Sequence, residues 1–551
     1  MTGVVEKPLT VIVVGAGYAG IGAARKLLDE GGKNIKVIVL EGGQRIGGRA
    51  CTMDGKEMGG TYFHGIYGHP LYEYASQHNI VGAPFTREFR WGFCEPSRPA
   101  PLDGSLPEGI REAAQEYASV LPSGDPASQG SSIGALLEQK FNQEGANLGN
   151  TAGTKSDDTE LRSRAWRWRE LVTRIASGCE SSADVSAAWW AGAEDLEGPN
   201  FPCPIGFQAL AEHMAAGADI RFGAVVEKIQ WGASGVDVRC ADGRSFQADA
   251  AVVTVSLGVL KATHAQLFEP ALPTEKQHAL QGLSIGTVNK IFVDFSQPGD
   301  ESGKHPSGDP VTAYHLLWNE PWQPGLGGKG PEVAAAEQAV PEWARGVFSV
   351  RFGGSEFKAP QASTNGHAAT QAQQQPPATA KSSTTNGARL PAFTGIGSSV
   401  YGNSSRETGR TAQEHCGTGL PAPWAEHTPC AVLWLTGEHA KAMEKCSDDE
   451  VHKGVTALLA AYPAIPYPDA AVPRIIRSSW GSDPLFRGSY SYVNAVGSPD
   501  DIDTLAAPLM VTGRPVVCFA GEATHRQLTG TMGAAFLTGQ REAGKLLAAY
   551  M

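Results

Sequence analysis

The sequence predicts an α/β fold organised around a parallel sheet, and two stretches near opposite ends of the chain carry this prediction. Near the N-terminus, an apolar strand at 9–14 is followed by a glycine-rich turn, a helix at 21–29 and a second strand at 37–40. Near the C-terminus, a β-branched strand leads to an acidic turn and then a long helix, in the runs Val516-Val-Cys-Phe-Ala-Gly521-Glu522 and Gly530-Thr531-Met532. A helix that begins at small residues presents unpaired N–H groups and partial positive charge to an electron-rich ligand. We therefore expect a ligand site where these strands end and these helices begin.

The glycine-rich turn has the spacing of a dinucleotide-binding fingerprint. In the run Gly15-Ala-Gly17-Tyr-Ala-Gly20, Gly15 permits the tight turn and Gly17 lets a pyrophosphate approach the backbone. Gly20 lets the helix pack on the strand, and Glu41 at the end of the second strand can accept hydrogen bonds from ribose hydroxyls. The alternative is a glycine turn in an ordinary βαβ unit. Because both strands, the helix and the acidic residue follow in order, we expect the turn to bind an ADP group.

Length and composition narrow the possible classes of protein. The chain has 551 residues, of which 41% are apolar, so two or more domains with a substantial core are expected. The net charge of −12 argues against nucleic acid as the main partner. Nine cysteines form no CxxC pair, which indicates free thiols and no metal site. No apolar run reaches the roughly 20 residues of a membrane span and no signal peptide is recognised, so we expect a cytoplasmic protein without membrane association.

The segment after Glu41 separates FAD from NAD by resemblance. The run Arg45-Ile-Gly47-Gly48-Arg49 allows a loop against a cofactor, and Arg49 can reach a phosphate. The stretch resembles the flavin amine oxidases, which hold FAD in an extended pose. Met58-Gly59-Gly60-Thr61 is similar to the next flavin-contacting turn of that family, and a histidine at the position of His64 is typical of its polyamine-oxidase branch. The family usually has alanine at Gly60 and Trp-Ile at Tyr62-Phe63, so local packing is expected to differ.

The resemblance continues through most of the chain and implies further site residues. Glu180 and Ser182 match positions that bind substrate in spermine oxidase, and the alternative for Glu180 is a solvated helix end. Val226 matches a backbone contact to adenine. Lys290 matches a lysine that holds a water near flavin N5, whereas a lysine at a strand start is usually only solvated. Trp480 and Tyr490 match aromatic residues along the flavin and the substrate tunnel, where core packing is the alternative.

The C-terminal helix start completes the implied flavin site. By resemblance, Gly521, Glu522, Thr531 and Met532 contact the cofactor. Gly533-Ala534 stand where the family often has His-Gly, so any role of that histidine side chain is lost here. No cysteine follows the family's covalent pattern near this helix, and noncovalent FAD is therefore expected.

The same resemblance implies the domain organisation. It is that of the amine oxidase fold, a Rossmann-type (GR2-like) FAD-binding domain with a discontinuous α+β substrate domain. The FAD-binding domain is expected at 8–85, 202–262 and 505–551, and the substrate domain at 86–201 and 263–504. Residues 355–425 are rich in Gln, Pro, Ser and Thr and are expected to form a disordered insertion between strands at 346–352 and 430–435. Helices are predicted at 132–141 and 161–175, strands at 220–222, 225–231 and 236–240, and a strand over 246–257.

The implied function is oxidation of a secondary amine of a polyamine, free or acetylated, by FAD and O2. Its products are an aldehyde, a shorter amine and hydrogen peroxide, with His64 and Lys290 in catalytic roles. The resemblance implies a small-molecule polyamine and O2 as partners, and a monomer is expected. Two alternatives remain open. One is a related flavin oxidase of another amine, an amino acid or methyl-lysine. The other is an FAD-containing scaffold whose insertion binds partners.

Overall fold

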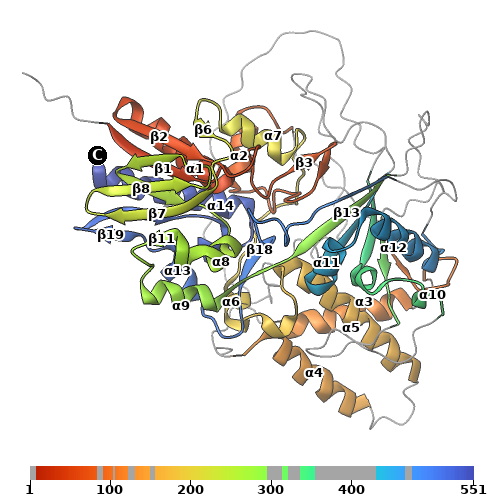
Figure 1. Ribbon diagram of the computed structural model, residues 1–551. Coiled ribbons are helices and arrows are strands. Elements are labelled where there is room, and N and C mark those ends of the chain that lie inside the picture. The colour runs from red at the N-terminus through yellow and green to blue at the C-terminus, as the bar shows by residue number, and fades with distance from the viewer. Residues whose placement is uncertain are drawn as a thin grey trace, which may run out of the picture.

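The computed structural model describes residues 8–82, 91–102, 106–121, 131–148, 156–294, 313–319, 335–353, 430–465 and 474–551. These residues form two six-stranded sheets, three smaller sheets and the helices that cover them (Figure 1). The predicted insertion at 355–425 lies outside the described residues. Within them, no helix combines the length and the apolar character that a membrane crossing requires.

The first six-stranded sheet is the predicted parallel sheet. Its order is β19-β20-β10-β1-β2-β6, and every neighbouring pair is parallel except β19 with β20. The strands are β1 (Leu9–Val14), β2 (Ile35–Leu40), β6 (Asp219–Arg221), β10 (Ala250–Val253), β19 (Leu509–Val511) and β20 (Arg514–Phe519). All six come from the segments 8–85, 202–262 and 505–551. The prediction of an α/β fold on a parallel sheet is confirmed, while the exact domain limits stay a prediction.

Two long helices from opposite ends of the chain pack on one face of this sheet. They are α1 (Tyr18–Gly31) and α14 (Met532–Tyr550), drawn beside β1 and β2 in Figure 1. Glycines let the two helices approach closely, because a Cβ on Gly539 would lie 1.9 Å from the carbonyl oxygen of Ala19. Leu27 of α1 and Leu546 of α14 are fully buried in the same apolar cluster as β1. The strand–turn–helix units predicted at the two termini are therefore neighbours in the fold.

A four-stranded sheet covers the other face of the parallel sheet. Its order is β11-β7-β8-β9, with β7 (Val226–Gly232), β8 (Gly235–Cys240), β9 (Ser245–Ala248) and β11 (Phe268–Glu269). The ring centroids of Phe268 and Phe519 are 5.8 Å apart across the interface. The neighbouring helices are α8 (Leu257–Leu267), α9 (Thr274–Gly282) and α13 (Pro499–Ala506).

The single strand predicted over 246–257 is wrong. The chain forms β9 in one sheet and β10 in another, and α8 begins at Leu257. Asp249 turns the chain between the sheets: its backbone N–H donates to Thr10 O at 2.9 Å, and its carboxylate accepts from Thr10 N at 2.8 Å. Ser256 then caps α8 by accepting from Val259 N at 3.1 Å. The continuous apolar character of this run hid both breaks.

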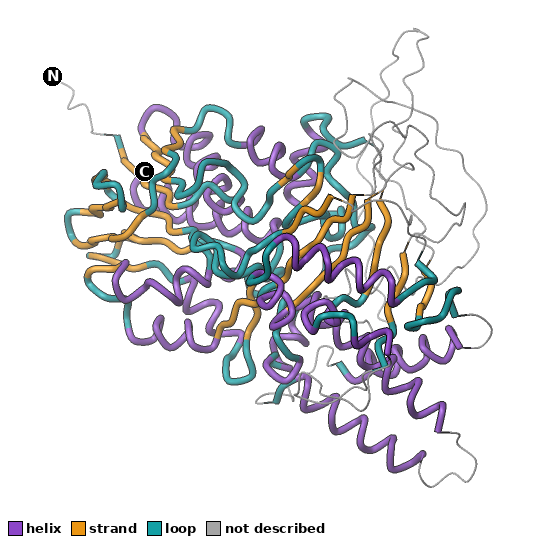
Figure 2. Tube along the Cα trace, turned by 45° about the vertical axis from the view of Figure 1, so that its right-hand side comes forward, coloured by secondary structure: helices purple, strands orange, loops and turns teal. Residues whose placement is uncertain are grey.

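The second six-stranded sheet lies in the other half of the molecule, visible as a row of strands flanked by helices in Figure 2. Its order is β17-β13-β16-β15-β14-β5, antiparallel throughout except for β14 with β5. The strands are β5 (Trp91–Cys94), β13 (Val288–Asp294), β14 (Ala313–Leu316), β15 (Ser349–Gly353), β16 (Cys430–Thr436) and β17 (Arg474–Arg477). In the register, Lys290 of β13 pairs with Trp434 of β16.

Helices cover this second sheet and short elements join the two halves. The helices are α3 (Leu106–Val120), α4 (Ile133–Leu148), α5 (Ser156–Ser177), α6 (Ala187–Gly192), α10 (Ala335–Gln338), α11 (Gly437–Glu444) and α12 (Asp448–Ala461). The predicted helices at 132–141 and 161–175 correspond to α4 and α5. The joining elements include α2 (Pro70–Gln77), α7 (Phe207–Met214), β3 (Thr52–Met53), β4 (Lys56–Glu57), β12 (Leu283–Gly286) and β18 (Tyr490–Val493).

Candidate active site

A cavity of about 920 Å³ lies where the two halves of the molecule meet. It runs from the glycine turn after β1, past the turn at 58–61 that follows β4, to strands β13, β15 and β16 of the second sheet. The residues that were predicted from the sequence and that line it are Gly15, Gly17, Glu41, Arg49, Gly60, Thr61, His64, Val226, Lys290, Trp480, Tyr490, Gly521, Glu522, Thr531 and Met532. The fold thus brings most of the predicted set into one continuous space.

The glycine turn after β1 is shaped as the fingerprint requires. Gly15 has a φ of +107°, and a Cβ on Gly20 would lie only 1.9 Å from the carbonyl oxygen of Gly15. Gly17 precedes α1 without a side-chain cap, and around it a Cβ would find nothing nearer than 3.8 Å. The N-terminus of α1 therefore presents free N–H groups to the cavity, with space beside them for a phosphate.

Glu41 fastens this turn to the loop after β2. Its carboxylate accepts from Ala16 N at 2.8 Å and from Gly43 N at 2.7 Å. A carboxylate offers about four lone-pair sites, so two backbone bonds leave capacity for hydroxyl donors. The predicted contact of Glu41 with a ribose stays a prediction, and its place on the cavity wall fits that role.

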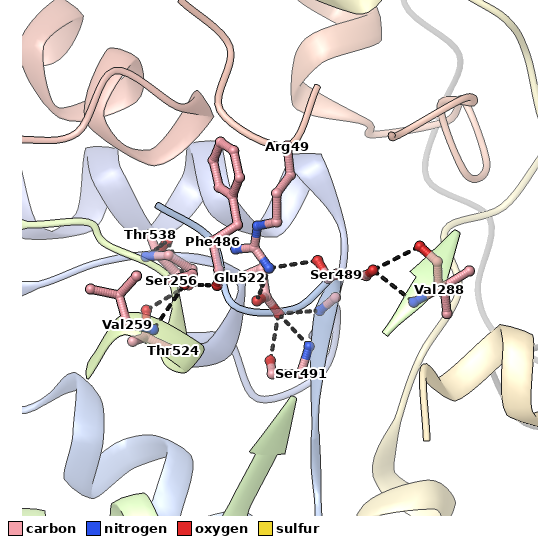
Figure 3. Close-up of polar contacts among 12 residues, drawn as sticks. Arg49, Ser256, Val259, Val288, Phe486, Ser489, Ser491, Glu522, Thr524 and Thr538 are labelled. Carbon is pink, nitrogen blue, oxygen red and sulfur yellow. Dashed lines mark hydrogen bonds and ion pairs between the residues drawn. The ribbon is translucent and has the colours of Figure 1, made fainter. Parts of the chain in front are cut away.

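Arg49 and Glu522 join the N-terminal and C-terminal parts of the site (Figure 3). Arg49 Nη1 donates to Glu522 Oε1 at 2.9 Å and to Ser489 O at 2.6 Å. The other carboxylate oxygen of Glu522 accepts from Ser491 N, from Ser491 Oγ and from Gly530 N, at 3.3, 2.5 and 3.1 Å. Glu522 is only 4% exposed, so this buried carboxylate organises the acidic turn predicted from the sequence.

Lys290 is buried on β13 and holds the end of β4 and the turn at 58–61. Its Nζ donates to Glu57 O at 2.7 Å, to Gly59 O at 2.5 Å and to Thr61 Oγ1. The same atom lies 4.5 Å from the ring centroid of Trp434. All three donors of a charged Lys290 are therefore used by the protein. Its predicted role beside flavin N5 stays a prediction, and fixing the turn at 58–61 is a contribution that the sequence did not indicate.

Glu57 is a buried carboxyl group next to Lys290 that sequence reasoning missed. Its Oε1 accepts from Phe207 N at 2.8 Å and from Thr52 Oγ1 at 3.0 Å. Burial raises the pKa of Glu57, and the charge of Lys290 opposes this shift. Burial likewise lowers the pKa of Lys290, and the carboxylate of Glu57 opposes that shift. The two groups therefore influence each other's protonation in the interior.

His64 stands on the cavity wall beside Tyr62, their ring centroids 6.3 Å apart. Burial lowers the pKa of His64, and a side-chain hydrogen bond with Asn200 opposes the shift. A neutral imidazole carries one donor and one acceptor nitrogen, so it can bind an amine in either protonation state. The placement fits the predicted catalytic role, which remains to be tested.

Trp480 and Tyr490 combine core packing with a place on the cavity wall. Trp480 Nε1 donates to Met58 O at 3.1 Å, which fixes the first residue of the turn at 58–61. The hydroxyl of Tyr490 donates to Ile175 O at the end of α5. Both rings are therefore fixed by hydrogen bonds and cannot rotate freely in the cavity.

At Gly60 and Gly533, two positions where the sequence differs from the resembled family, neighbouring side chains occupy the space that a larger residue would need. A Cβ on Gly60 would lie 2.5 Å from the sulfur of Met532, so the Met532 side chain would have to move to admit an alanine at this position. A Cβ on Gly533 would lie 3.2 Å from Nε2 of His69, which occupies the space beside the helix start. Thr531 caps α14 by accepting from Ala534 N at 3.0 Å.

Glu180 and Ser182 are the two predicted substrate residues that do not line the cavity. The carboxylate of Glu180 forms an ion pair with Lys441, and burial raises its pKa. The buried Ser182 begins a short 3-10 helix (Ser182–Asp184), and its backbone N–H donates to Glu170 Oε1 at 3.1 Å. Substrate binding by these residues stays a prediction, although neither faces the space that the other site residues share.

Three acids that the sequence did not single out line the cavity, namely Glu194, Asp195 and Glu227. Glu194 and Asp195 follow α6. Glu194 Oε1 accepts from Gln527 Nε2 at 2.8 Å, and Glu194 N donates to Gln527 O at 3.1 Å. The contact of Glu194 with the loop before α14 joins segments more than 300 residues apart. No local pattern in the sequence marks that contact.

The family model described as flavin containing amine oxidoreductase matches residues 18–334 and 401–547. "Polyamine oxidase 1" of Oryza sativa subsp. japonica is 27% identical, over 99% of this chain and 98% of its own length. "Peroxisomal N(1)-acetyl-spermine/spermidine oxidase" of Bos taurus is 27% identical, over 98% of this chain and 94% of its own. "Lysine-specific histone demethylase 1 homolog 2" of Arabidopsis thaliana is 29% identical over 98% of this chain but only 58% of its own length.

Solved structures share the fold. A putrescine oxidase bound to putrescine has a TM-score of 0.58 at 17% identity, covering 98% of this chain and 99% of its own. Cyclohexylamine oxidase from Brevibacterium oxydans IH-35A has a TM-score of 0.58 at 18% identity, with the same coverage. At such identities the likeness concerns the fold alone.

Proposed function

The chain belongs to the flavin containing amine oxidoreductase family, and from this premise we propose that it is a polyamine oxidase. The coarser activity, that of an FAD-dependent amine oxidase, follows from the family. The finer assignment rests chiefly on one observation: the cavity that contains the dinucleotide turn continues to a region with a neutral histidine, aromatic walls and two carboxylates. Full-length similarity to proteins named polyamine oxidase supports the same assignment.

The residues of this chain fit FAD in an extended pose. The free N–H groups at the start of α1, the glycines around them and Glu41 suit the ADP group. The residues proposed to hold the cofactor are Gly15, Gly17, Gly20, Glu41, Arg49, Gly60, Thr61, Val226, Trp480, Gly521, Glu522, Thr531 and Met532. We propose noncovalent attachment, because no described cysteine is among the residues that line the cavity.

FAD, when bound, would supply the redox chemistry, a two-electron oxidation of the carbon–nitrogen bond of the amine with O2 as the final electron acceptor, which gives an aldehyde and a shorter amine after hydrolysis. The chain's residues bind and orient the amine. The reacting nitrogen must be neutral, and the neutral imidazole of His64 can accept from or donate to it without adding charge. Trp434, Tyr490 and Tyr62 form apolar walls that suit the methylene segments of a polyamine.

Glu194 and Asp195 are proposed to bind the remote cationic nitrogens. We expect Glu194→Gln to raise the KM for spermine about 3- to 10-fold, since one partly exposed charge pair contributes roughly 1 kcal/mol. The matched control is Glu180→Gln, which changes a carboxylate held by Lys441 outside the cavity. Steady-state kinetics of both variants decide between the two acids. If only Glu180→Gln raised the KM, the cationic nitrogens of the substrate would be bound by Glu180, as the sequence indicated, and not by Glu194.

Glu57 is expected to set the pH at which Lys290 changes protonation. The carboxylate favours charged Lys290, whereas burial and the charge of Arg351 disfavour it. Glu57→Gln should therefore move the Lys290 inflection in the pH profile of flavin reoxidation to lower pH, while its amide oxygen still accepts from Phe207 N. Lys290→Met serves as the control and should remove the inflection. An inflection that stays in place in Glu57→Gln would show that the carboxyl does not act on Lys290.

Partners and location follow from the same proposal. The proposed partners are a small-molecule polyamine and O2, with neither nucleic acid nor membrane, and the protein is proposed to be a cytoplasmic monomer. A relative named peroxisomal makes the compartment worth testing by fluorescence microscopy of the tagged protein. Oxidation of another amine, an amino acid or methyl-lysine would use the same flavin chemistry, and the substrate panels below separate these alternatives.

A further inference from the structure

Arg351 brings a second cation to the part of the cavity that contains Lys290. It lies on β15, where it pairs with Val432 of β16, two residues from Trp434. Since side chains alternate along a strand, Arg351, Trp434 and Lys290 project from the same face of the second sheet. All three line the cavity. The floor of the proposed substrate region is therefore basic, which a simple polyamine does not require.

The electrostatic interactions of Arg351 with its neighbours also indicate that this part of the cavity is basic. Burial lowers the pKa of Arg351, and Tyr62 is the neighbour that opposes the shift. Arg351 in turn disfavours the charged forms of Lys290 and His315.

Among the acids that line the cavity, Glu41 and Glu227 lie toward the dinucleotide turn, and Glu522 is bound to Arg49. Glu194 and Asp195 belong to a separate loop. The cavity is thus basic at the sheet and acidic at the loop after α6.

A substrate that is cationic at every remote position would meet like charge at this floor. A guanidinium presents a planar fork of donors that matches a carboxylate, and it also binds amide carbonyl oxygens strongly. We propose that Arg351 binds an oxygen acceptor of the substrate, a carboxylate or an amide carbonyl, while Glu194 and Asp195 bind its cationic part. This inference rests on the proposed amine oxidation and makes the substrate an amine with an acyl or carboxyl group at one end.

Two matched pairs of amines distinguish the sources of the oxygen. N1-acetylspermidine and spermidine differ in an amide carbonyl, and N-(4-aminobutyl)-β-alanine and N-ethylputrescine differ in a carboxylate, while all four keep a secondary amine. The readout is the ratio of kcat/KM within each pair for the FAD-loaded wild type, Arg351→Met, Arg351→Lys and the exposed control Arg239→Met. Wild type should prefer the oxygen-bearing member of one pair, and that pair identifies the acceptor. Arg351→Met should lower this ratio about 10- to 100-fold, as expected for one charge-assisted hydrogen bond or bidentate pair.

Arg351→Lys is expected to lower the ratio less, because it keeps the charge and loses the fork. It also provides the test if Arg351→Met fails to fold, as judged by its FAD content. Arg239→Met should leave the ratio as in wild type, since Arg239 lies on β8 in another sheet. A wild type that prefers the plain amine in both pairs, or ratios that do not change in the Arg351 variants, would overturn the inference and leave amine oxidation standing. Failure of every amine, spermine included, to reduce the flavin would overturn the proposed function and this inference together.

Discussion

Glu522→Ala is expected to yield protein that does not retain FAD and that is largely unfolded at room temperature. The buried carboxylate accepts bonds from Arg49 Nη1, Ser491 N, Ser491 Oγ and Gly530 N. Removing one partner of a buried ion pair costs about 3–5 kcal/mol, and each further buried donor left without an acceptor costs about 1–3 kcal/mol. The sum is comparable with the roughly 5–15 kcal/mol that stabilises a whole domain. FAD content from the visible absorbance, together with thermal unfolding by circular dichroism, measures the effect.

The control for this variant is Glu438→Ala. The side chain of Glu438 is 77% exposed and contacts Lys441 at 3.4 Å, so its loss should change neither FAD content nor Tm appreciably. Glu522→Gln should be intermediate, because the amide keeps one acceptor but turns a donor toward other donors. If Glu522→Ala kept its flavin and the Tm of the control, the carboxylate would not be the organising group of the acidic turn.

Gly20→Ala is expected to weaken FAD binding by about ten- to hundredfold, since forcing an extra methyl into packed structure costs about 1–3 kcal/mol. The added Cβ would lie 1.9 Å from Gly15 O and 3.3 Å from Thr254 Oγ1. The nearest of these atoms is backbone, so the glycine turn itself must shift. Titration of the apoprotein with FAD, followed by quenching of flavin fluorescence, gives the apparent Kd.

Gly192→Ala is the matched control for this second variant. Gly192 ends helix α6, and a Cβ there would have no neighbour within 4 Å. It should bind FAD as wild type does. Equal Kd values for the Gly20→Ala and Gly192→Ala proteins would mean that the contact between Gly20 and Gly15 does not shape the cofactor site.

The parts of the fold that were predictable depend on local sequence. The strand β1 has its predicted bounds because an apolar run ends directly at Gly15. The turn after it follows from glycine spacing, since only glycine fits at Gly20 against Gly15 O. Lys290 and His64 were indicated by resemblance, and both line the cavity.

The parts that were not predictable depend on contacts between distant segments. Arg351 faces the cavity because of the antiparallel register of β15 and β16, and no spacing in the sequence reveals that register. Glu194 reaches the site through its bonds with Gln527. Conversely, Glu180 was indicated by resemblance, but it pairs with Lys441 away from the cavity. Such outcomes follow from tertiary packing, which a one-dimensional pattern does not contain.

The most direct test of polyamine oxidation is anaerobic mixing of the FAD-loaded protein with spermine, spermidine, N1-acetylspermine and a simple monoamine. Loss of the oxidised flavin absorbance reports hydride transfer before O2 takes part. The account predicts fast bleaching by at least one polyamine, much slower bleaching by the monoamine, and recovery of the absorbance with hydrogen peroxide when O2 is admitted. Bound flavin that none of the polyamines bleaches would contradict it.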